Sequence, residues 1–353
     1  MFQPSKETLA ILEDLERRID PAGEEDYLAQ WREFLFDRFE GSIFTPRRPV
    51  MTAPGTPLPP ININDALADY DLMLRHQLSG VSHTLNSPST SPALRANYGS
   101  AILSSLFGAE LFVMPYHTDT LPTTRCLGDT DKIRALVEQG VPPLRTSLGE
   151  KTFAFGEIWA ELSRRYPNVH RYVAMYHPDL QGPLDIAELL WGGEMFYAMY
   201  DEPELVHAFL SLITDTYTAF MEEWFKLFPP SPEMNPHWGI LYHRGTIALR
   251  DDSAMNLSPE LYEEFALPYD QKLLEHFDGG IVHFCGRGDH YIPALCRANK
   301  LYGINMSQPE YNDMEIIYRN TVDKGIPLLC FSPPVAQRDQ HRAGGFHGRL
   351  QTL

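Results

Sequence analysis

The sequence predicts an α/β protein built as a (β/α)8 TIM barrel with an N-terminal helical extension. Three observations lead to this prediction. Short apolar segments alternate with helical patterns from about residue 111 to residue 331, which is typical of parallel βαβ units. The chain has 353 residues, enough for one large barrel. It contains no glycine-rich dinucleotide fingerprint and no P-loop, so an open nucleotide-binding sheet has no direct support.

The N-terminal part of the chain is expected to differ from the barrel. Residues 5–40 show two charged amphipathic helical patterns that are interrupted near Pro21. Prolines are frequent in residues 44–62, and they favour an extended connector because proline disrupts helices. We therefore expect a helical extension and proline-rich connector over residues 1–62, followed by a catalytic barrel over residues 63–353.

The other elements follow from hydrophobic periodicity and from start and stop signals. Apolar runs that fit strands lie at residues 111–115, 172–176, 238–242, 246–250, 280–284, 301–306 and 326–331. Helical patterns lie at about residues 64–78, 129–139, 148–164, 185–191, 203–227, 258 onward, 289–298 and 312–323. Ser258 and Pro259 form a typical helix start, with serine as N-cap and proline at the first position. About seven strands are predicted, so one strand of the barrel is unassigned.

Composition limits the partners and the compartment. Lys and Arg number 29 against 47 Asp and Glu, which gives a net charge of -18 and disfavours binding to nucleic acid or anionic membranes. No apolar run approaches the roughly 20 residues that span a bilayer, and the polar N-terminus lacks a signal-type apolar core. Four cysteines in a chain of this length do not form a disulfide framework. We expect a cytoplasmic protein that acts on a small-molecule substrate and binds neither nucleic acid nor membrane.

The most informative segment is Ile281-Val-His-Phe-Cys-Gly-Arg-Gly-Asp-His290. Residues two apart on a strand point to the same side, so His283 and Cys285 project together at a strand end, where parallel α/β folds carry their sites. Imidazole nitrogen and thiolate sulfur suit zinc. Cys330 ends a later strand and would be a third ligand, leaving the open position of a catalytic zinc site. Alternatively, His283 lines a pocket without metal and both cysteines fill the core.

Other polar residues follow the predicted strands. Asp251 and Asp252 are adjacent, so at most one of them faces the pocket, where it could act as a general acid or base. A loop acid or helix N-cap is the alternative for either residue. The remaining candidates, each of which could also be an ordinary loop residue, are His177 for catalysis and Gln181, His243, Tyr116 and His117 for substrate binding.

Three segments together resemble the uroporphyrinogen decarboxylase superfamily, which also contains zinc-dependent cobalamin methyltransferases. They are residues 179–192 (DLQGPLDIAELLWG), residues 251–269 (DDSAMNLSPELYEEFALPY) and residues 282–286 (VHFCG). The resemblance extends over roughly residues 95–335 and implies a (β/α)8 barrel with a pocket at the carboxyl ends of the strands.

The methyltransferase branch of this superfamily carries H-x-C followed by a distant cysteine. His283 and Cys285 match that pattern, and Cys330 is nearer in sequence than the usual third ligand. The resemblance implies zinc held by these residues, a thiol-type methyl acceptor, and a corrinoid methyl donor carried by a partner protein. It is also compatible with a homodimer.

Two other functions stay open at this point. The first is metal-independent decarboxylation of a porphyrinogen or another carboxylated substrate, which predicts a basic pocket lined by Arg47, Arg48, Arg244 or Arg250. The arginine-rich N-terminal pattern of the true decarboxylases is missing from the chain. The second is a non-catalytic protein that binds a tetrapyrrole or corrinoid.

Overall fold

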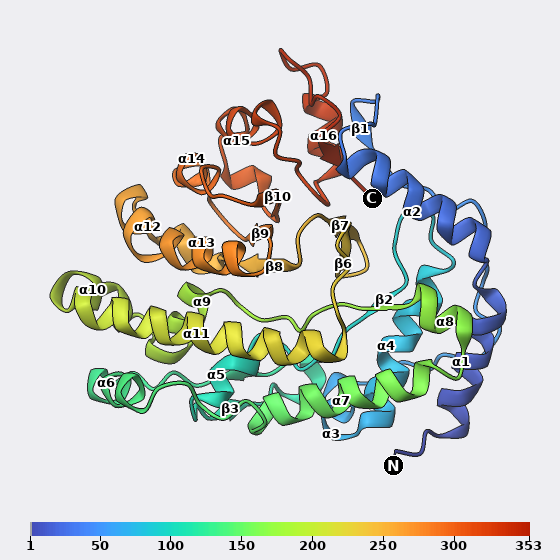
Figure 1. Ribbon diagram of the computed structural model, residues 1–353, viewed down its shortest axis with the longest axis horizontal. Helices are drawn as coiled ribbons and strands as arrows, with labels where there is room; N and C mark the ends of the chain where they lie inside the picture. Colours follow the sequence, from blue (N-terminus) through green and yellow to red (C-terminus); the bar gives the residue numbers. More distant parts are fainter. Residues whose placement is uncertain (1) are drawn as a thin grey trace.

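Three parallel strands lie near the centre of the molecule, and their register decides which polar side chains meet. The computed structural model describes residues 2–353 (Figure 1). One parallel sheet has the order β8 (Ile247–Arg250), β9 (Gly280–Phe284), β10 (Leu301–Met306). In this register Arg250 lies opposite His283, and His283 lies opposite Asn305. Three polar residues therefore form one row near the carboxyl ends of the sheet.

The parallel arrangement continues beyond this sheet. Leu328 forms parallel bridges to Ile304 and Leu350. Two further parallel pairs are β1 (Ile43–Phe44) with β11 (Leu350–Gln351), and β2 (Ala93–Leu94) with β5 (Ala174–Met175). Within residues 2–353 no ladder joins β5 to β8 or β1 to β2. The mixed α/β class with parallel strands is confirmed, whereas closure of a complete barrel stays a prediction.

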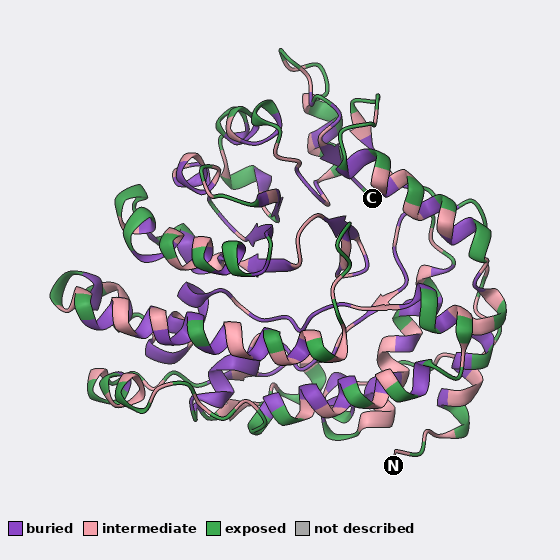
Figure 2. Cartoon of the chain, in the orientation of Figure 1, coloured by how far each residue is buried: buried purple, intermediate pink, exposed green. Residues whose placement is uncertain are grey.

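Helices surround the strands, and Figure 2 shows their buried faces turned inward. The α-helices are α1 (Lys6–Arg18), α2 (Pro21–Leu35), α3 (Ile63–Ala68), α4 (Tyr70–Thr84), α5 (Ile102–Leu106), α6 (Thr130–Gln139), α7 (Ser147–Ser163), α8 (Pro167–Tyr172), α9 (Pro183–Trp191), α10 (Glu194–Asp201), α11 (Pro203–Leu227), α12 (Pro259–Phe265), α13 (Leu267–His276), α14 (Ile292–Leu295), α15 (Met314–Asn320) and α16 (Pro333–Asp339). Short 3-10 turns are η1 (Tyr116–Thr118), η2 (Asp252–Asn256), η3 (Pro309–Tyr311) and η4 (Val322–Lys324).

Several helix boundaries follow directly from the sequence. Ser258 accepts a hydrogen bond from the backbone N–H of Leu261, and Pro259 opens α12 as predicted. The bounds of α11 are those of the predicted helical pattern. Helices α5, α8, α10 and α16 were not predicted, because elements of 5 to 8 residues have too few turns to show a hydrophobic period.

Two predicted segments have a different place in the structure. The strand expected at residues 111–115 is β3 (Leu111–Phe112), which pairs antiparallel with β4 (Thr123–Thr124) outside the parallel strands. The connector expected within residues 1–62 contains β1, whose pairing with β11 makes it part of the parallel arrangement. The boundary at residue 62 therefore does not separate the strands from the extension.

An antiparallel hairpin lies between the two groups of parallel strands. It consists of β6 (Asn235–His237) and β7 (Leu241–His243), where the sequence predicts a single strand. At its tip Trp238 and Gly239 have left-handed backbone angles, with φ of 50° and 69°. The Gly239 carbonyl accepts a 2.7 Å hydrogen bond from Ser91, just before β2, whereas the Trp238 ring lies 5.2 Å from the His283 ring of β9. The hairpin thus contacts both strand groups (Figure 1).

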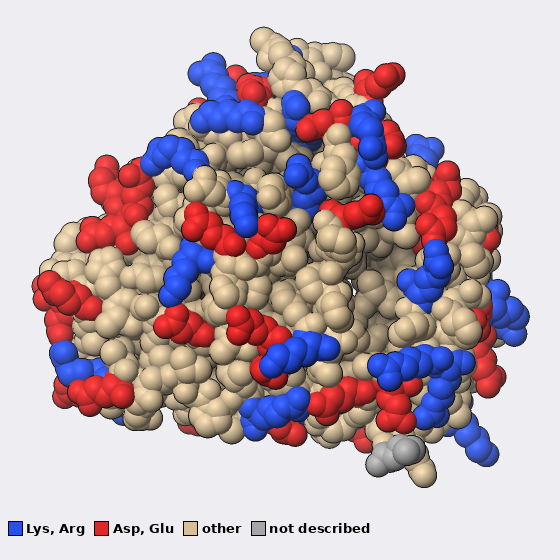
Figure 3. Space-filling model, in the orientation of Figure 1, with Lys and Arg blue, Asp and Glu red and all other residues tan. Residues whose placement is uncertain are grey.

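The surface carries both signs of charge. Figure 3 shows acidic and basic side chains interspersed over the visible face. Between residues 2 and 353, none of the helices combines the length and the apolar character that crossing a membrane requires.

Candidate metal centre

Three side chains converge at the carboxyl ends of β8 and β9. Asp252 opens η2 directly after β8, His283 lies in β9, and Cys285 follows β9. Their ligand atoms lie within 4.8 Å of one another. His283 Nε2 is 3.4 Å from Cys285 Sγ and 3.5 Å from Asp252 Oδ1, and the same carboxylate oxygen accepts the backbone N–H of Cys285 at 2.7 Å. A nitrogen, a sulfur and an oxygen atom that can bind a metal are thus held together, and Asp252, His283 and Cys285 form what is called the triad below.

His283 is buried and Cys285 is partly buried, and this burial favours the neutral forms of both side chains in the absence of metal. Burial lowers the pKa of His283, although Asp252 and a hydrogen bond to Asn305 oppose this shift. Burial also raises the pKa of the Cys285 thiol, against a weak hydrogen bond to Ser307 at 3.5 Å. A neutral imidazole can bind a metal at once, whereas the thiol must first release its proton.

The three residues line an open cavity of about 490 Å³. Its walls combine polar and apolar groups, and they are formed by Trp238, Ile240, Arg250, Asp252, His283, Cys285, Asn305, Met306, Ser307, Cys330, Phe331, Ser332, Pro333 and Leu353. The cavity has the size of a typical small-molecule site.

Cys330 lines this cavity but is not a member of the three-residue cluster. Its backbone is left-handed, with φ of 49°, and its N–H donates to the Gln351 side chain at 2.6 Å. Burial raises the pKa of its thiol to about 11. The structure therefore groups Asp252, for which the sequence suggested catalysis, with His283 and Cys285, while the role of Cys330 as a ligand stays a prediction.

An arginine stands beside the triad. Arg250 lines the cavity, forms an ion pair with Asp179, and packs its guanidinium 5.0 Å from the centre of the Trp238 ring. Asp179 also pairs with Arg95. Two arginines thus share one carboxylate, and of these three groups only Arg250 lines the cavity.

The other arginines that a decarboxylase would need have different surroundings. Arg48 is buried in an ion pair with Glu24, and Arg244 lies over the rings of Phe36 and Tyr302. Neither these two nor Arg47 lines the cavity of the triad.

Asp251 points away from the cavity, as the alternation of adjacent residues requires. It is buried, and burial together with the neighbouring Asp270 holds its pKa well above the usual range. Asp185 is likewise buried, and it accepts the backbone N–H groups of Asp252 and Ser253 at 3.2 and 2.7 Å. Burial and Asp270 therefore favour the protonated form of Asp251, and Asp185 fixes the turn that presents Asp252.

His177 has both ring nitrogens in hydrogen bonds within the fold. Nδ1 is 2.8 Å from the Pro178 carbonyl, which it donates to, and Nε2 accepts the backbone N–H of Ala248 at 2.9 Å. Burial lowers its pKa to about 4, so the ring is neutral near pH 7. This places His177 as a link between β5 and β8 rather than in the triad cavity.

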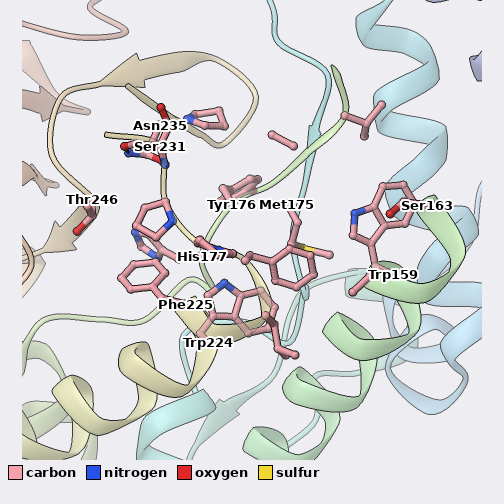
Figure 4. Close-up of a pocket in the computed structure, with 18 of the residues that line it drawn as sticks. Trp159, Ser163, Met175, Tyr176, His177, Trp224, Phe225, Ser231, Asn235 and Thr246 are labelled. Carbon is pink, nitrogen blue, oxygen red and sulfur yellow. Dashed lines mark hydrogen bonds between the residues drawn. The ribbon is translucent and has the colours of Figure 1, made fainter. Parts of the chain in front are cut away.

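His177 also lines a second, aromatic cavity of about 360 Å³. Figure 4 shows Trp159 of α7 and Trp224 of α11 facing His177 and Tyr176 across it. It shares no lining residue with the cavity of the triad.

The remaining predicted residues are dispersed. His243 is fully buried in the hairpin, where its Nδ1 lies 2.9 Å from the Arg244 carbonyl and burial lowers its pKa to about 4. Gln181 lines a separate cavity of about 370 Å³. Tyr116 and His117 are exposed on η1, and the Tyr116 hydroxyl donates to Asp65. None of these four residues lines the cavity of the triad.

Sequence reasoning missed three residues that shape this cavity. Asn305 and Ser307 lie at the end of a strand that was predicted correctly, and the rule that strand ends carry sites would have selected them. Trp238 had no such signal, because its position depends on the hairpin.

Comparison with known proteins identifies a shared fold. No family model matches the chain, and no curated protein matches its sequence. A solved structure of a methyltransferase from Methanosarcina mazei matches with a TM-score of 0.59 and 13% identity, over 92% of this chain and 91% of that chain. This likeness extends over almost the whole length of both chains, and at this identity it shows the fold alone.

Proposed function

We propose that the protein is a zinc-dependent methyltransferase of the uroporphyrinogen decarboxylase superfamily, which moves a methyl group from a corrinoid to a thiol-type acceptor. The observation that carries this proposal is the cluster of Asp252, His283 and Cys285 at the wall of an open cavity. The shared fold with a methyltransferase supports it, as does the H-x-C motif.

The donor set fits zinc. Zinc binds imidazole nitrogen, thiolate sulfur and carboxylate oxygen, and its catalytic sites combine three protein ligands with one open position. Here the three ligand atoms come from two neighbouring strand ends, and the cavity provides room for a further ligand. We propose His283 and Cys285 as ligands, with Asp252 or Cys330 as the third.

The residues around the cluster would have distinct tasks. His283 supplies a neutral nitrogen, Cys285 a thiolate after loss of its proton, and Asp252 a second negative charge. Bound zinc would lower the pKa of an acceptor thiol and thereby supply a thiolate nucleophile at neutral pH. Trp238 and Met306 cover part of the cavity with apolar surface, which would limit the access of water to the acceptor.

We also propose that the two groups of parallel strands close into a (β/α)8 barrel. Eight parallel segments are available, namely β8, β9, β10, the segment at Leu328, β11, β1, β2 and β5. Hydrogen bonds at both gaps support closure, among them Ala248 N–H to His177, and Arg48 N–H to the Pro88 carbonyl at 2.6 Å.

Metal content tests the proposal. We expect about one zinc per chain in the purified protein, lost in His283→Ala and Cys285→Ala. Cys296→Ala is the matched control, because Cys296 caps α14 outside the cavity. Comparing Asp252→Asn with Cys330→Ala then identifies the third ligand. A wild-type protein without zinc after reconstitution would contradict the proposal.

Methyl transfer tests the reaction itself. The absorbance of methylcobalamin should change when the zinc-loaded protein is mixed with it and a thiol, and the metal-free protein should give no change. Full activity in the metal-free protein would refute a role for zinc. Binding of cobalamin without transfer would favour a non-catalytic corrinoid-binding protein. The decarboxylase alternative has less support, because Arg250 is the only one of its four candidate arginines in the cavity.

A further inference from the structure

One hydrogen-bond chain runs from the backbone into the candidate metal centre. Asn305 of β10 is buried, with 6% of its surface exposed. Its Nδ2 donates to the Leu329 carbonyl at 2.7 Å, and its Oδ1 lies 2.6 Å from His283 Nδ1. The three residues lie on three neighbouring parallel segments, and Leu329 is itself held by a 2.8 Å hydrogen bond from its N–H to the Ile304 carbonyl.

This chain permits a single assignment of protons. A backbone carbonyl only accepts hydrogen bonds, so the Asn305 atom that faces Leu329 must be the amide nitrogen. The amide oxygen then faces His283 and also only accepts, so His283 Nδ1 must carry a hydrogen. In a neutral imidazole the other nitrogen, Nε2, is left with a free lone pair.

We propose that Asn305 is a positioning residue that holds His283 in the tautomer with a hydrogen on Nδ1, so that the lone pair of Nε2 faces the metal site. Nε2 is the nitrogen that lies 3.4 Å from Cys285 Sγ and 3.5 Å from Asp252 Oδ1. In the opposite tautomer two lone pairs would face each other between His283 and Asn305, and a hydrogen on Nε2 would point into the cluster. The relevance of this residue to metal binding rests on the proposed function, whereas its effect on the tautomer does not.

The position of Asn305 on a strand makes the arrangement rigid. Its Cα lies opposite that of His283 in the β9–β10 register, and both side chains line the same cavity. Removing the hydrogen-bond partner of a ligating histidine commonly weakens metal binding by about 10- to 100-fold.

Two variants separate the hydrogen-bonding role from the shape of the side chain. Asn305→Leu keeps a similar size but can neither accept from His283 nor donate to Leu329. Asn305→Asp keeps the shape, and a protonated carboxyl group there donates to Leu329 and accepts from His283. Asn235→Leu is the matched control, because Asn235 also bonds to backbone groups, at Ser231 and Gly245, and contacts none of the three triad residues.

The first measurement is made on metal-free protein. Nitrogen NMR of ¹⁵N-histidine-labelled protein distinguishes a protonated from an unprotonated ring nitrogen, and His283→Ala identifies the signals of His283. We expect protonated Nδ1 and unprotonated Nε2 in the wild type and in Asn305→Asp, and a mixture of both tautomers in Asn305→Leu. A wild-type His283 with its hydrogen on Nε2, or an unchanged tautomer in Asn305→Leu, overturns the proposal.

The second measurement is zinc affinity, by competition with a chromophoric chelator. Asn305→Leu should weaken binding by at least about tenfold, whereas Asn305→Asp and Asn235→Leu should stay within about threefold of the wild type. Equal affinities for the wild type and Asn305→Leu overturn the role in metal binding. If Asn305→Leu does not fold, a tautomer in Asn305→Asp that differs from the wild type overturns the proposal. A wild type that binds no zinc refutes the proposed function, and the tautomer experiment still decides the role of Asn305.

Discussion

Replacing His177 by alanine should destabilise the fold while leaving Asp252, His283 and Cys285 in place. His177 is buried, and its imidazole links the Pro178 carbonyl after β5 to the Ala248 N–H of β8. No ladder within residues 2–353 joins these two strands, so the ring supplies a hydrogen bond that a neighbouring strand would otherwise provide.

The size of the effect follows from the groups left behind. The Ala248 N–H would lose its partner, and a buried unpaired group costs about 1–3 kcal/mol, whereas the Pro178 carbonyl would keep its hydrogen bond from the Leu180 N–H. Loss of the ring also enlarges the aromatic cavity of about 360 Å³. From one unpaired group and the enlarged cavity together we expect a loss of about 2–5 kcal/mol, which is a large fraction of the roughly 5–15 kcal/mol by which proteins of this kind are stable.

Urea unfolding followed by circular dichroism measures this loss. His170→Ala is the control, because His170 lines the same cavity but is exposed, and its change should stay within about 0.5 kcal/mol. The pKa of His177 is lowered to about 4, so the folded ring is neutral at pH 6 and at pH 8, whereas the unfolded chain takes up the proton below about pH 6.5. The loss should therefore be smaller at pH 6 than at pH 8. A variant with wild-type stability and no methyl transfer would refute this reasoning and restore the catalytic role suggested by the sequence.

Three further predictions concern buried and ligating groups. His237→Phe should raise the stability of the fold below about pH 6.5. Both ring nitrogens of His237 are buried without partners, and burial lowers the pKa of the ring, so below this pH only the unfolded chain takes up the proton. Acid unfolding of the variant should therefore begin at a lower pH than that of the wild type. Burial and Asp185 raise the pKa of Asp270 to about 8, so between about pH 4 and about pH 8 only the unfolded chain releases the proton, and the stability of the fold decreases as the pH rises. Asp270→Asn should make this decrease smaller, which urea unfolding at pH 4 and at pH 8 would measure. Zinc affinity, measured by chelator competition, should rise about tenfold per pH unit from pH 6 to pH 8, because Cys285 must release a proton before it binds the metal. An affinity that does not change with pH would show that Cys285 is not a ligand.

Local rules account for the part of the site that could be read from the sequence. His283 and Cys285 are two apart at a strand end, and the pleat of one strand is enough to place them on the same side. The same rule separates Asp251 from Asp252, and only Asp252 lines the cavity. These inferences need no knowledge of neighbouring strands.

Contacts between strands could not be read in this way. The pairing of His283 with Asn305 depends on the register of β9 and β10, which hydrophobic patterns do not specify to one residue. Tyr116 and His117 follow an apolar run that looks like the other strands, yet that run pairs antiparallel outside the parallel arrangement. The seven predicted strands do not include β1, β2 or β11, because a strand of two residues is too short to show a hydrophobic pattern.

The hairpin of β6 and β7 has a consequence for how proteins with this architecture can diverge. It shares no ladder with the parallel strands, yet its tip residue Trp238 forms one wall of the cavity beside His283. Insertions, deletions or substitutions at this tip would alter the size of the molecule that fits there while leaving the strand register beneath it intact. Selection for a new ligand of this cavity could therefore act on a few residues of one turn, without rebuilding Asp252, His283 and Cys285.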